Sequence, residues 1–348
     1  MSVTAPALYR TAELDDALAR LNIEGHWKSN REGPPSSPVA MGEACVWRWS
    51  DVYPHVLQAG EVLGIEGGAS RRTLRLCSPG MPNKTTTPTI HTSIQMVKPG
   101  EVAEAHRHSI GAFRFVVQGS GAHTTVDGER FVMEKHDLVL TPAWTWHNHG
   151  NESDEPIIWI DGHDMPLLRS LNLMFFEAYN DTQQTISRPE GFTRRLGGAM
   201  RPKNGEAHGK NGLPYIYKGR EAMECLRSLS PAERDPYDGL TIDYVNPYSG
   251  GPTMPTMSCR LHLLEASMPT ARHRHTASTI YHVVEGAGTT VINDKTIEWT
   301  TGDMFVVPNW AWHSHAAAAN VNAVLFSVTD EPILAALGHM RSEADTSL

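Results

Sequence analysis

The sequence predicts an all-β protein built from two similar jelly-roll domains, with short helices at the N-terminus and between the domains. From Arg71 onward the chain reads as short alternating runs punctuated by Gly, Pro or Asp, which is typical of the many short strands of a sandwich or barrel. The pattern then repeats: ARHRHTASTIYHVVEG, from residue 271, matches EAHRHSIGAFRFVVQG, from residue 104, and VPNWAWHSH matches TPAWTWHNH. Such a match indicates an internal duplication.

The repeat and the changes in composition divide the chain into four segments. Residues 1–45 are expected to form a helix and an irregular arm, and residues 46–165 the first β domain. Residues 166–240 are expected to be a linker of helix and loop, and residues 241–348 the second β domain. Apolar residues recur at helical spacing in TAELDDALARLN, residues 11–22, and a second short helix is expected in residues 220–234, ending near Pro231.

Composition and charge exclude several classes of function. The chain is 40% hydrophobic and 20% charged with a net charge of -9, and it has no basic run, so we expect no nucleic-acid partner. We expect no membrane association, because no apolar run approaches the length of a span, and we expect a cytoplasmic location because the N-terminus lacks a signal-peptide pattern. The four cysteines (Cys45, Cys77, Cys225 and Cys259) are scattered and predict buried free thiols.

Three histidines of the first domain form a candidate metal site. His106 and His108 are one residue apart, and alternate residues of a strand point to the same face. His147 follows 39 residues after His108, which is far enough for antiparallel strands to return it to the same place. Three neutral imidazoles converging from strands would hold a metal ion and leave coordination positions open.

These residues resemble the motifs of the cupin superfamily. His108 to Gly119 and His275 to Gly286 have the spacing of the first motif, and Gly302 to His313 has that of the second. The sequence departs from the pattern in both copies: Ala112 and Thr279 replace the motif glutamate, and Trp144 and Trp310 replace the glycine of PxG. Loss of the glutamate together with PxWxWH resembles the bicupin gentisate 1,2-dioxygenase family, which includes dioxygenases of salicylate, substituted salicylates and 1-hydroxy-2-naphthoate.

The resemblance implies an iron(II)-dependent, extradiol-type ring cleavage. One Fe(II) per N-terminal cupin would be bound by His106, His108 and His147. The substrate would be a small aromatic acid, a 2-hydroxybenzoate, whose C1–C2 bond is opened with both atoms of O2 inserted. The resemblance also implies a homotetramer.

Other residues of the first domain are candidates for binding the substrate. Arg114 lies six residues after His108, on the same strand face, and would bind the carboxylate, as an arginine at this position does in the family. A second arginine, Arg72 in preference to Arg71, is expected to reach the same group. The resemblance places Gln95 in the pocket as well, and Trp144 would either form part of the pocket wall or belong to the core.

Two further residues are candidates for transferring a proton and for orienting a neighbouring side chain. His149 lies two residues after His147 and leans to the same side, and the family uses this position to handle a proton of the reacting oxygen. Asp161, in WIDG, matches a carboxylate that orients an imidazole or an arginine.

Which substituent the protein accepts on the substrate ring is expected to depend on two residues that differ from the family. Family members commonly have an aromatic residue at the position of His91 and a leucine at that of His163. A polar wall would suit gentisate or a salicylate with a polar 5-substituent such as nitro. Salicylate and 1-hydroxy-2-naphthoate are the alternative substrates. More distant alternatives are a manganese cupin decarboxylase or isomerase and a non-enzymatic cupin.

The second domain repeats the three candidate metal ligands but not the candidate substrate-binding residues. His273, His275 and His313 form a complete second triad, whereas the positions of Arg114, Gln95 and Asp161 are occupied by Tyr281, His262 and Ser327. Whether this triad holds a metal is left open by the sequence.

Overall fold

The computed structural model describes residues 11–29, 34–64, 72–194 and 212–346, which form two compact units, residues 1–39 and 40–348. The first unit contains helices α1 (Thr11–Ala19) and α2 (His26–Ser29). The indole Nε1 of Trp27, in α2, donates a hydrogen bond to Oδ1 of Asp15, in α1, at 3.0 Å. The helix predicted over residues 11–22 is therefore present, and it ends at Ala19.

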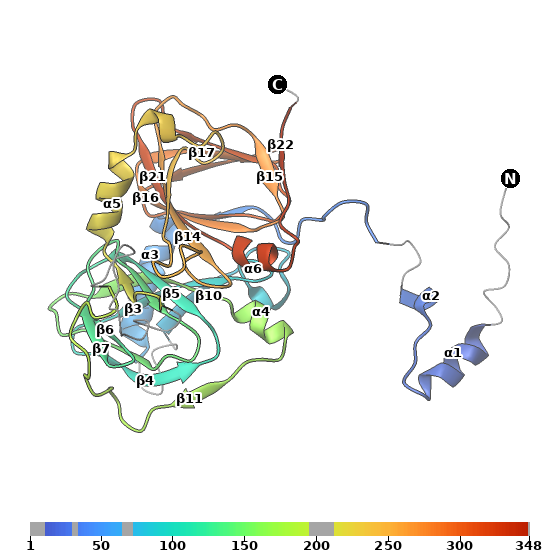
Figure 1. The fold of residues 1–348 in the computed structure, drawn as a ribbon, viewed down its shortest axis with the longest axis horizontal. Coiled ribbons are helices and arrows are strands. Elements are labelled where there is room, and N and C mark those ends of the chain that lie inside the picture. The colour runs from blue at the N-terminus through green and yellow to red at the C-terminus, as the bar shows by residue number, and fades with distance from the viewer. Residues whose placement is uncertain (1–10, 30–33, 65–71, 195–211, 347–348) are drawn as a thin grey trace. The chain divides into compact units, whose positions relative to one another are not determined.

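The second unit consists of two β domains, each made of a six-stranded and a five-stranded antiparallel sheet (Figure 1). In the N-terminal domain the six-stranded sheet has the order β12 (Ile216–Tyr217), β8 (Leu138–Thr141), β5 (Ala112–Gln118), β10 (Ile157–His163), β3 (His91–Val97) and β2 (Thr73–Leu76). The five-stranded sheet has the order β11 (Phe176–Ala178), β4 (Val102–His108), β9 (His147–Gly150), β6 (His123–Val126) and β7 (Glu129–Val132).

The C-terminal domain repeats this topology. Its six-stranded sheet has the order β1 (Cys45–Trp47), β19 (Met304–Val307), β16 (Thr279–Glu285), β21 (Ala323–Thr329), β14 (Ser258–Leu264) and β13 (Leu240–Asp243). The other sheet has the order β18 (Lys295–Thr300), β17 (Ala287–Ile292), β20 (His313–Ala317), β15 (His273–His275) and β22 (Ser342–Ala344). The predicted pair of all-β jelly-roll domains is confirmed.

Each domain has its own interior, and a third core joins the two. Between the two sheets of the N-terminal domain, apolar side chains such as Val116, Phe131 and Trp159 are fully buried. The outer faces of the two six-stranded sheets share one large core, in which Phe115 stacks on Phe326 with ring centroids 4.1 Å apart. Because aromatic residues bury a large apolar area, this contact makes the two domains one packed body.

The segments that precede the two domains are exchanged between them. Strand β1 was assigned to the N-terminal domain from the sequence, but it pairs with β19 of the C-terminal domain. Strand β12, from the linker, pairs with β8 of the N-terminal domain. The helix that follows each strand packs the other way: α3 (Trp49–Val62) lies against β3, and α5 (Gly219–Ser228) lies against β14 (Figure 1).

A buried aspartate fixes each exchanged segment where its helix begins. Asp303 accepts hydrogen bonds from Arg48 Nη1 at 2.9 Å and from the backbone N–H of Trp49 at 2.8 Å. Asp137 accepts them in the same way from Lys218 Nζ at 2.6 Å and from the N–H of Gly219 at 2.8 Å. A carboxylate at a helix N-terminus satisfies free N–H groups and opposes the positive end of the helix dipole.

The remaining elements are short. They are η2 (Pro82–Lys84), α4 (Met165–Ser170), η4 (Pro231–Glu233) and α6 (Glu331–Ala336). The predicted helix in residues 220–234 is thus present as α5 and η4. All four cysteines are free, but only Cys259 is buried and Cys225 is exposed, so the prediction of buried thiols was wrong for Cys225. Across the described residues, no helix has the length and apolar character that a membrane crossing requires.

Candidate metal centre and substrate pocket

Three histidines of the N-terminal domain converge from two neighbouring strands. His106 and His108 lie on β4 and His147 starts β9, with His106 directly opposite His147 in the ladder. Their side chains offer ligand atoms that all lie within 4.8 Å of one another. The alternation of side chains on β4 and the register of β4 with β9 therefore produce the triad predicted from the sequence.

Backbone carbonyls fix the orientation of all three rings. Nδ1 of His106 donates to Glu104 O at 2.7 Å, that of His108 to Ile110 O at 2.9 Å, and that of His147 to Thr145 O at 3.0 Å. A proton on Nδ1 leaves the lone pair of Nε2 free, which is the arrangement found behind metal-bound histidines. Nε2 of His147 is buried and has no hydrogen-bond partner in the part of the chain that is described.

The electrostatics of the triad suit a cation. Burial is the largest effect on the pKa of each imidazole. It lowers the pKa of His108 to about 4 and that of His147 well below the ordinary value. The three rings are therefore neutral near pH 7 and able to donate lone pairs. Three neutral nitrogen donors with an unpartnered buried Nε2 fit a divalent transition metal with open positions.

Arg114 lies on β5 of the six-stranded sheet, so the prediction that it shares a strand face with His108, on β4 of the five-stranded sheet, was wrong. It is buried, its Nη1 donates to Thr141 Oγ1 at 3.1 Å, and its Nε lies 3.2 Å from Asp161 Oδ1 as an ion pair without hydrogen-bond alignment. Asp161 is directly opposite Arg114 in the ladder between β10 and β5. Burial raises the pKa of Asp161 to about 6, against the lowering effect of Arg114, so the carboxylate is ionised at neutral pH. Asp161 is thus the charged partner of the guanidinium.

His149 lies next to the triad and is held by a hydroxyl group. Its Nδ1 is 2.7 Å from Thr124 Oγ1, and its ring centroid is 5.9 Å from that of His147 and 5.5 Å from that of Trp159. Burial, with Arg114 second, lowers the pKa of His149 well below its ordinary value, so the ring is neutral. Its Nε2 has no hydrogen-bond partner within the described residues and is free for a ligand.

His91 and His163 form a polar wall on the same sheet face as Arg114. His91 is opposite His163, as Asp161 is opposite Ser93, and the His91 and His163 rings stack at 6.2 Å. His91 is only 2% exposed, and neither of its nitrogens has a partner among the residues described here. Burial lowers the pKa of His91 to about 4, so the pair is neutral. Gln95 is buried four residues after His91 on this face of β3, opposite Trp159.

Arg72 makes a different contact from the one we predicted. Its Nη1 and Nη2 bind both carboxylate oxygens of Glu101 at 2.6 and 2.7 Å, and its Nε and Nη2 donate to Leu63 O at 3.1 and 2.6 Å. These bonds occupy the guanidinium in a structural ion pair. The alternative, Arg71, lies outside the described residues.

Trp144 also has contacts other than those expected of a pocket wall. Its backbone has a φ of 63° where the cupin motif has glycine, its N–H donates to His108 O at 2.8 Å, and its side chain is 39% exposed. The ring stacks on Phe175, and the Arg107 guanidinium lies 5.1 Å from the ring centroid. The structure thus shows Trp144 as a turn residue that carries a surface aromatic cluster.

Sequence reasoning missed three residues with hydroxyl groups near these side chains. Thr124 orients His149, Thr141 binds Arg114, and the buried hydroxyl of Ser93 faces the same side as Asp161 without a partner in the described ranges. Ser93 could have been found, because it alternates with His91 and Gln95 on one strand. Thr124 and Thr141 could not, since their importance depends on strand pairing.

Comparison with known proteins identifies the class. The cupin domain profile matches residues 93–163 and 262–329, one match in each domain, so the chain is a double cupin. A 5-aminosalicylate 1,2-dioxygenase of Comamonas sp. is 39% identical, over 98% of this chain and 93% of that protein. A gentisate 1,2-dioxygenase of Aquipseudomonas alcaligenes is 38% identical, over 90% of this chain and 91% of that protein.

A solved structure agrees with these relatives. The salicylate 1,2-dioxygenase of Pseudoaminobacter salicylatoxidans, as its adduct with gentisate, superimposes with a TM-score of 0.88 at 32% identity, covering 99% of this chain and 97% of that one. The chain belongs to the bicupin gentisate 1,2-dioxygenase family, and the prediction of a ring-cleaving dioxygenase is confirmed.

Proposed function

We propose that the protein is an Fe(II)-dependent 1,2-dioxygenase of a 2-hydroxybenzoate with a polar group at C5, such as gentisate, 5-aminosalicylate or 5-nitrosalicylate. One Fe(II) per N-terminal cupin is bound by His106, His108 and His147. The observation that carries the proposal is a neutral histidine triad on the same interior as the buried cation Arg114. This combination suits a ligand that offers a phenolate and a carboxylate together.

The metal, when bound, supplies the chemistry that joins O2 to the ring, so that the C1–C2 bond opens with both oxygen atoms inserted. Arg114 binds the carboxylate through its guanidinium and fixes the ring relative to the triad. Asp161 and Thr141 hold Arg114 in place, so that little orientation has to be gained when the substrate arrives. Exclusion of bulk water strengthens the contact between the two charges.

His149 is the group that handles a proton in the proposed reaction. Thr124 Oγ1 also lies 3.2 Å from Met133 Sδ, to which it donates. It then accepts from His149 Nδ1, so that Nε2 presents a lone pair to the substrate as a base. We propose that this nitrogen takes the proton of the substrate hydroxyl group and later returns it.

The polar C5 substituent is proposed because of His91 and His163. A buried imidazole without hydrogen bonds is costly, and a hydroxyl, amino or nitro group would supply the missing partner. Salicylate offers no such group, and 1-hydroxy-2-naphthoate offers an apolar second ring. This reasoning favours 5-substituted substrates, although a 1-hydroxy-2-naphthoate dioxygenase of Nocardioides sp. is also 39% identical, over 99% of this chain and 91% of that protein.

Oxygen uptake by the ferrous-reconstituted protein tests the proposed function. Gentisate, 5-aminosalicylate, 5-nitrosalicylate, salicylate and 1-hydroxy-2-naphthoate are compared at equal concentration. We expect the highest kcat/KM with a 5-substituted compound and a product that retains both atoms of ¹⁸O2. No uptake with any compound would contradict the dioxygenase assignment, and a preference for the naphthoate would contradict the polar pocket.

The His91→Phe variant tests the polar wall directly. Phenylalanine keeps the ring but removes both nitrogens, so we expect kcat/KM for the best 5-substituted substrate to fall about tenfold, the equivalent of one neutral hydrogen bond. The value for salicylate should stay within about twofold. An equal loss for both substrates would show that His91 acts through packing alone.

We also propose that the protein is a cytoplasmic homotetramer. An exposed apolar cluster at Leu171, Leu173, Met174, Phe175 and Phe176 supports burial against another subunit. Four free cysteines are consistent with a reducing compartment. Light scattering should give a mass about four times the 38.4 kDa of one chain, and a monomer mass would contradict the assembly.

A further inference from the structure

The C-terminal cupin contains a second set of converging imidazoles. His273 and His275 lie on β15, and His313 starts β20 directly opposite His273. Their ligand atoms also lie within 4.8 Å of one another. Nδ1 of His275 donates to Ala277 O, and that of His313 to Ala311 O, both at 2.9 Å. The Nε2 atoms of these two rings therefore carry free lone pairs.

The burial of this triad is hard to explain without a ligand. His273, His275 and His313 are 7%, 8% and 0% exposed, and His313 Nε2 has no hydrogen-bond partner among the described residues. A buried nitrogen without a partner is destabilising, whereas a shared cation would satisfy all three rings at once. We propose that these histidines bind a second divalent transition-metal ion, at a site that excludes the aromatic carboxylate.

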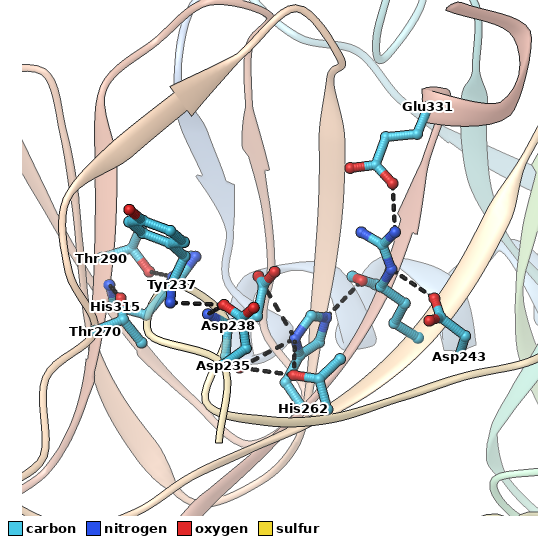
Figure 2. Close-up of polar contacts among 12 residues, drawn as sticks. Asp235, Tyr237, Asp238, Asp243, His262, Thr270, Thr290, His315 and Glu331 are labelled. Atoms are coloured by element: carbon cyan, nitrogen blue, oxygen red, sulfur yellow. Dashed lines mark hydrogen bonds and ion pairs between the residues drawn. The ribbon is translucent and has the colours of Figure 1, made fainter. Parts of the chain in front are cut away.

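A second layer of contacts supports the triad. His315 Nδ1 is 2.8 Å from Thr290 Oγ1, which accepts a further hydrogen bond from Trp299 Nε1 at 2.9 Å. The backbone N–H of His315 donates to Thr270 Oγ1 at 2.9 Å (Figure 2). Strand β20, which carries His313, is thereby fixed by hydrogen bonds on either side. Support of this kind orients metal ligands in proteins.

The pocket beside the triad has lost its free cation. Tyr281 lies opposite Ser327, as Arg114 lies opposite Asp161 in the first domain. The arginine on this side, Arg260, donates to Asp243 at 2.7 Å and to Glu331. Two carboxylates on one guanidinium leave no positive charge for a ligand.

An acidic turn adds negative charge to the same pocket. The Asp235 side chain accepts hydrogen bonds from the N–H groups of Tyr237 at 2.7 Å and Asp238 at 3.0 Å, which fixes the turn (Figure 2). The Tyr237 ring lies 4.6 Å from that of His273, and Asp238 Oδ1 lies 3.8 Å from His262 Nδ1. A carboxylate near the triad favours a metal cation and repels an anionic substrate.

Metal content of the full-length protein tests the second site. Apoprotein is loaded anaerobically with Fe²⁺, and separately with Zn²⁺, then desalted and analysed by mass spectrometry of the elements. We expect two ions per chain in the wild type and in the control His55→Ala, one in His313→Ala and in His147→Ala, and none in the double variant. One ion per chain that is lost in His147→Ala and kept in His313→Ala would overturn the proposal, whereas one ion lost only in His313→Ala would contradict the first site instead.

Measuring substrate binding tests whether the second metal site excludes the aromatic carboxylate. Calorimetry under anaerobic conditions should give one gentisate per chain in the wild type and in His313→Ala, and none in His147→Ala. One equivalent bound by His147→Ala would overturn the exclusion. Circular dichroism confirms that each variant is folded, and His273→Asn replaces His313→Ala if the latter is not. Neither measurement requires turnover. The second metal site is therefore tested separately from the proposed dioxygenase activity.

Discussion

At the residue scale, the charge of Arg114 distinguishes the two cupins of this chain. Arg114 and Tyr281 occupy matching positions, each opposite the corresponding residue of the neighbouring strand. Arg114 is buried, and among the described residues only Asp161 forms an ion pair with it, so it has capacity for a second anion. The change from Arg114 to Tyr281 is therefore one of the differences by which we expect only the first domain to bind a carboxylate.

Replacing Arg114 with alanine should weaken substrate binding while metal is retained. Loss of a charge-assisted hydrogen bond costs about 1.5–3 kcal/mol, so we expect KM to rise about 10- to 100-fold. Steady-state oxygen uptake and metal analysis measure the two effects. Arg130→Ala, which removes an exposed pair with Glu152, is the matched control and should leave KM unchanged. An unchanged KM in Arg114→Ala would remove this residue from the proposed role.

Asp161 should make stability depend on pH. Its pKa is raised from 3.8 to about 6 in the folded protein, because burial disfavours the charge. Between about pH 4 and pH 6 the unfolded state has already lost the proton that the folded state keeps, so stability falls as the pH rises, by on the order of 3 kcal/mol in total. The Asp161→Asn variant should lack this contribution.

Urea unfolding at several pH values measures that difference. Burial raises the pKa of Asp330 to about 6 as well, so the wild type and the variant both have a second contribution of the same sign. The comparison is therefore between slopes of stability against pH, and the slope of Asp161→Asn should be the shallower one over pH 4 to 6. Parallel slopes would show that Asp161 is not protonated in the folded protein in this range.

At the scale of elements, the exchanged segments connect the two cupins in a way that strand patterns do not reveal. The run VWRW alternates like any strand, and the sequence contains no signal for its partner. The pairing of β1 with β19 depends on Asp303, which holds Arg48 and Trp49 at the junction between β1 and α3. Asp137 performs the same function for β12 and α5.

Replacing Asp303 with alanine should therefore destabilise the whole protein. The change leaves the N–H of Trp49 and the charge of Arg48 without their partner, and breaking a buried pair costs about 3–5 kcal/mol. Denaturant unfolding measures this loss. Glu285→Ala, which breaks the exposed pair with Arg227, should cost less than about 1 kcal/mol. Equal losses in the two variants would show that the buried aspartate does not fix the segment.

At the scale of the whole molecule, the core between the six-stranded sheets couples the two domains. Phe115 and Phe326 stack face to face in it, with an angle of 16° between their planes. Because this core contains residues of both cupins, neither domain can unfold without exposing the apolar face of the other.

The Phe326→Ala variant tests this coupling. Removing a buried phenylalanine costs about 3–5 kcal/mol, and we expect one cooperative transition shifted to lower denaturant. Tryptophan fluorescence follows both domains, while loss of activity follows the N-terminal one. Val321→Ala, at a position that is 46% exposed, should leave the midpoint unchanged. Activity that survives a first fluorescence transition would show that the domains unfold separately.

The sequence by itself determined the duplication, the β class and both histidine triads. These depend on local rules, because alternate residues on a strand share a face and similar spacing of matching motifs in two copies implies similar folds. His149 could be found in the same way, since it shares a strand face with His147, whereas Arg114 lies on β5, in the other sheet from the ligand strands β4 and β9.

Only the tertiary structure decided which groups meet across strands. Four features depend on pairing between distant segments. Glu101 binds Arg72, and Thr124 supports His149. Trp144 lies at the surface, and an acidic turn lies beside the second triad. The physical reason is that register and sheet order place side chains in space, whereas local sequence fixes only the face on which each side chain lies.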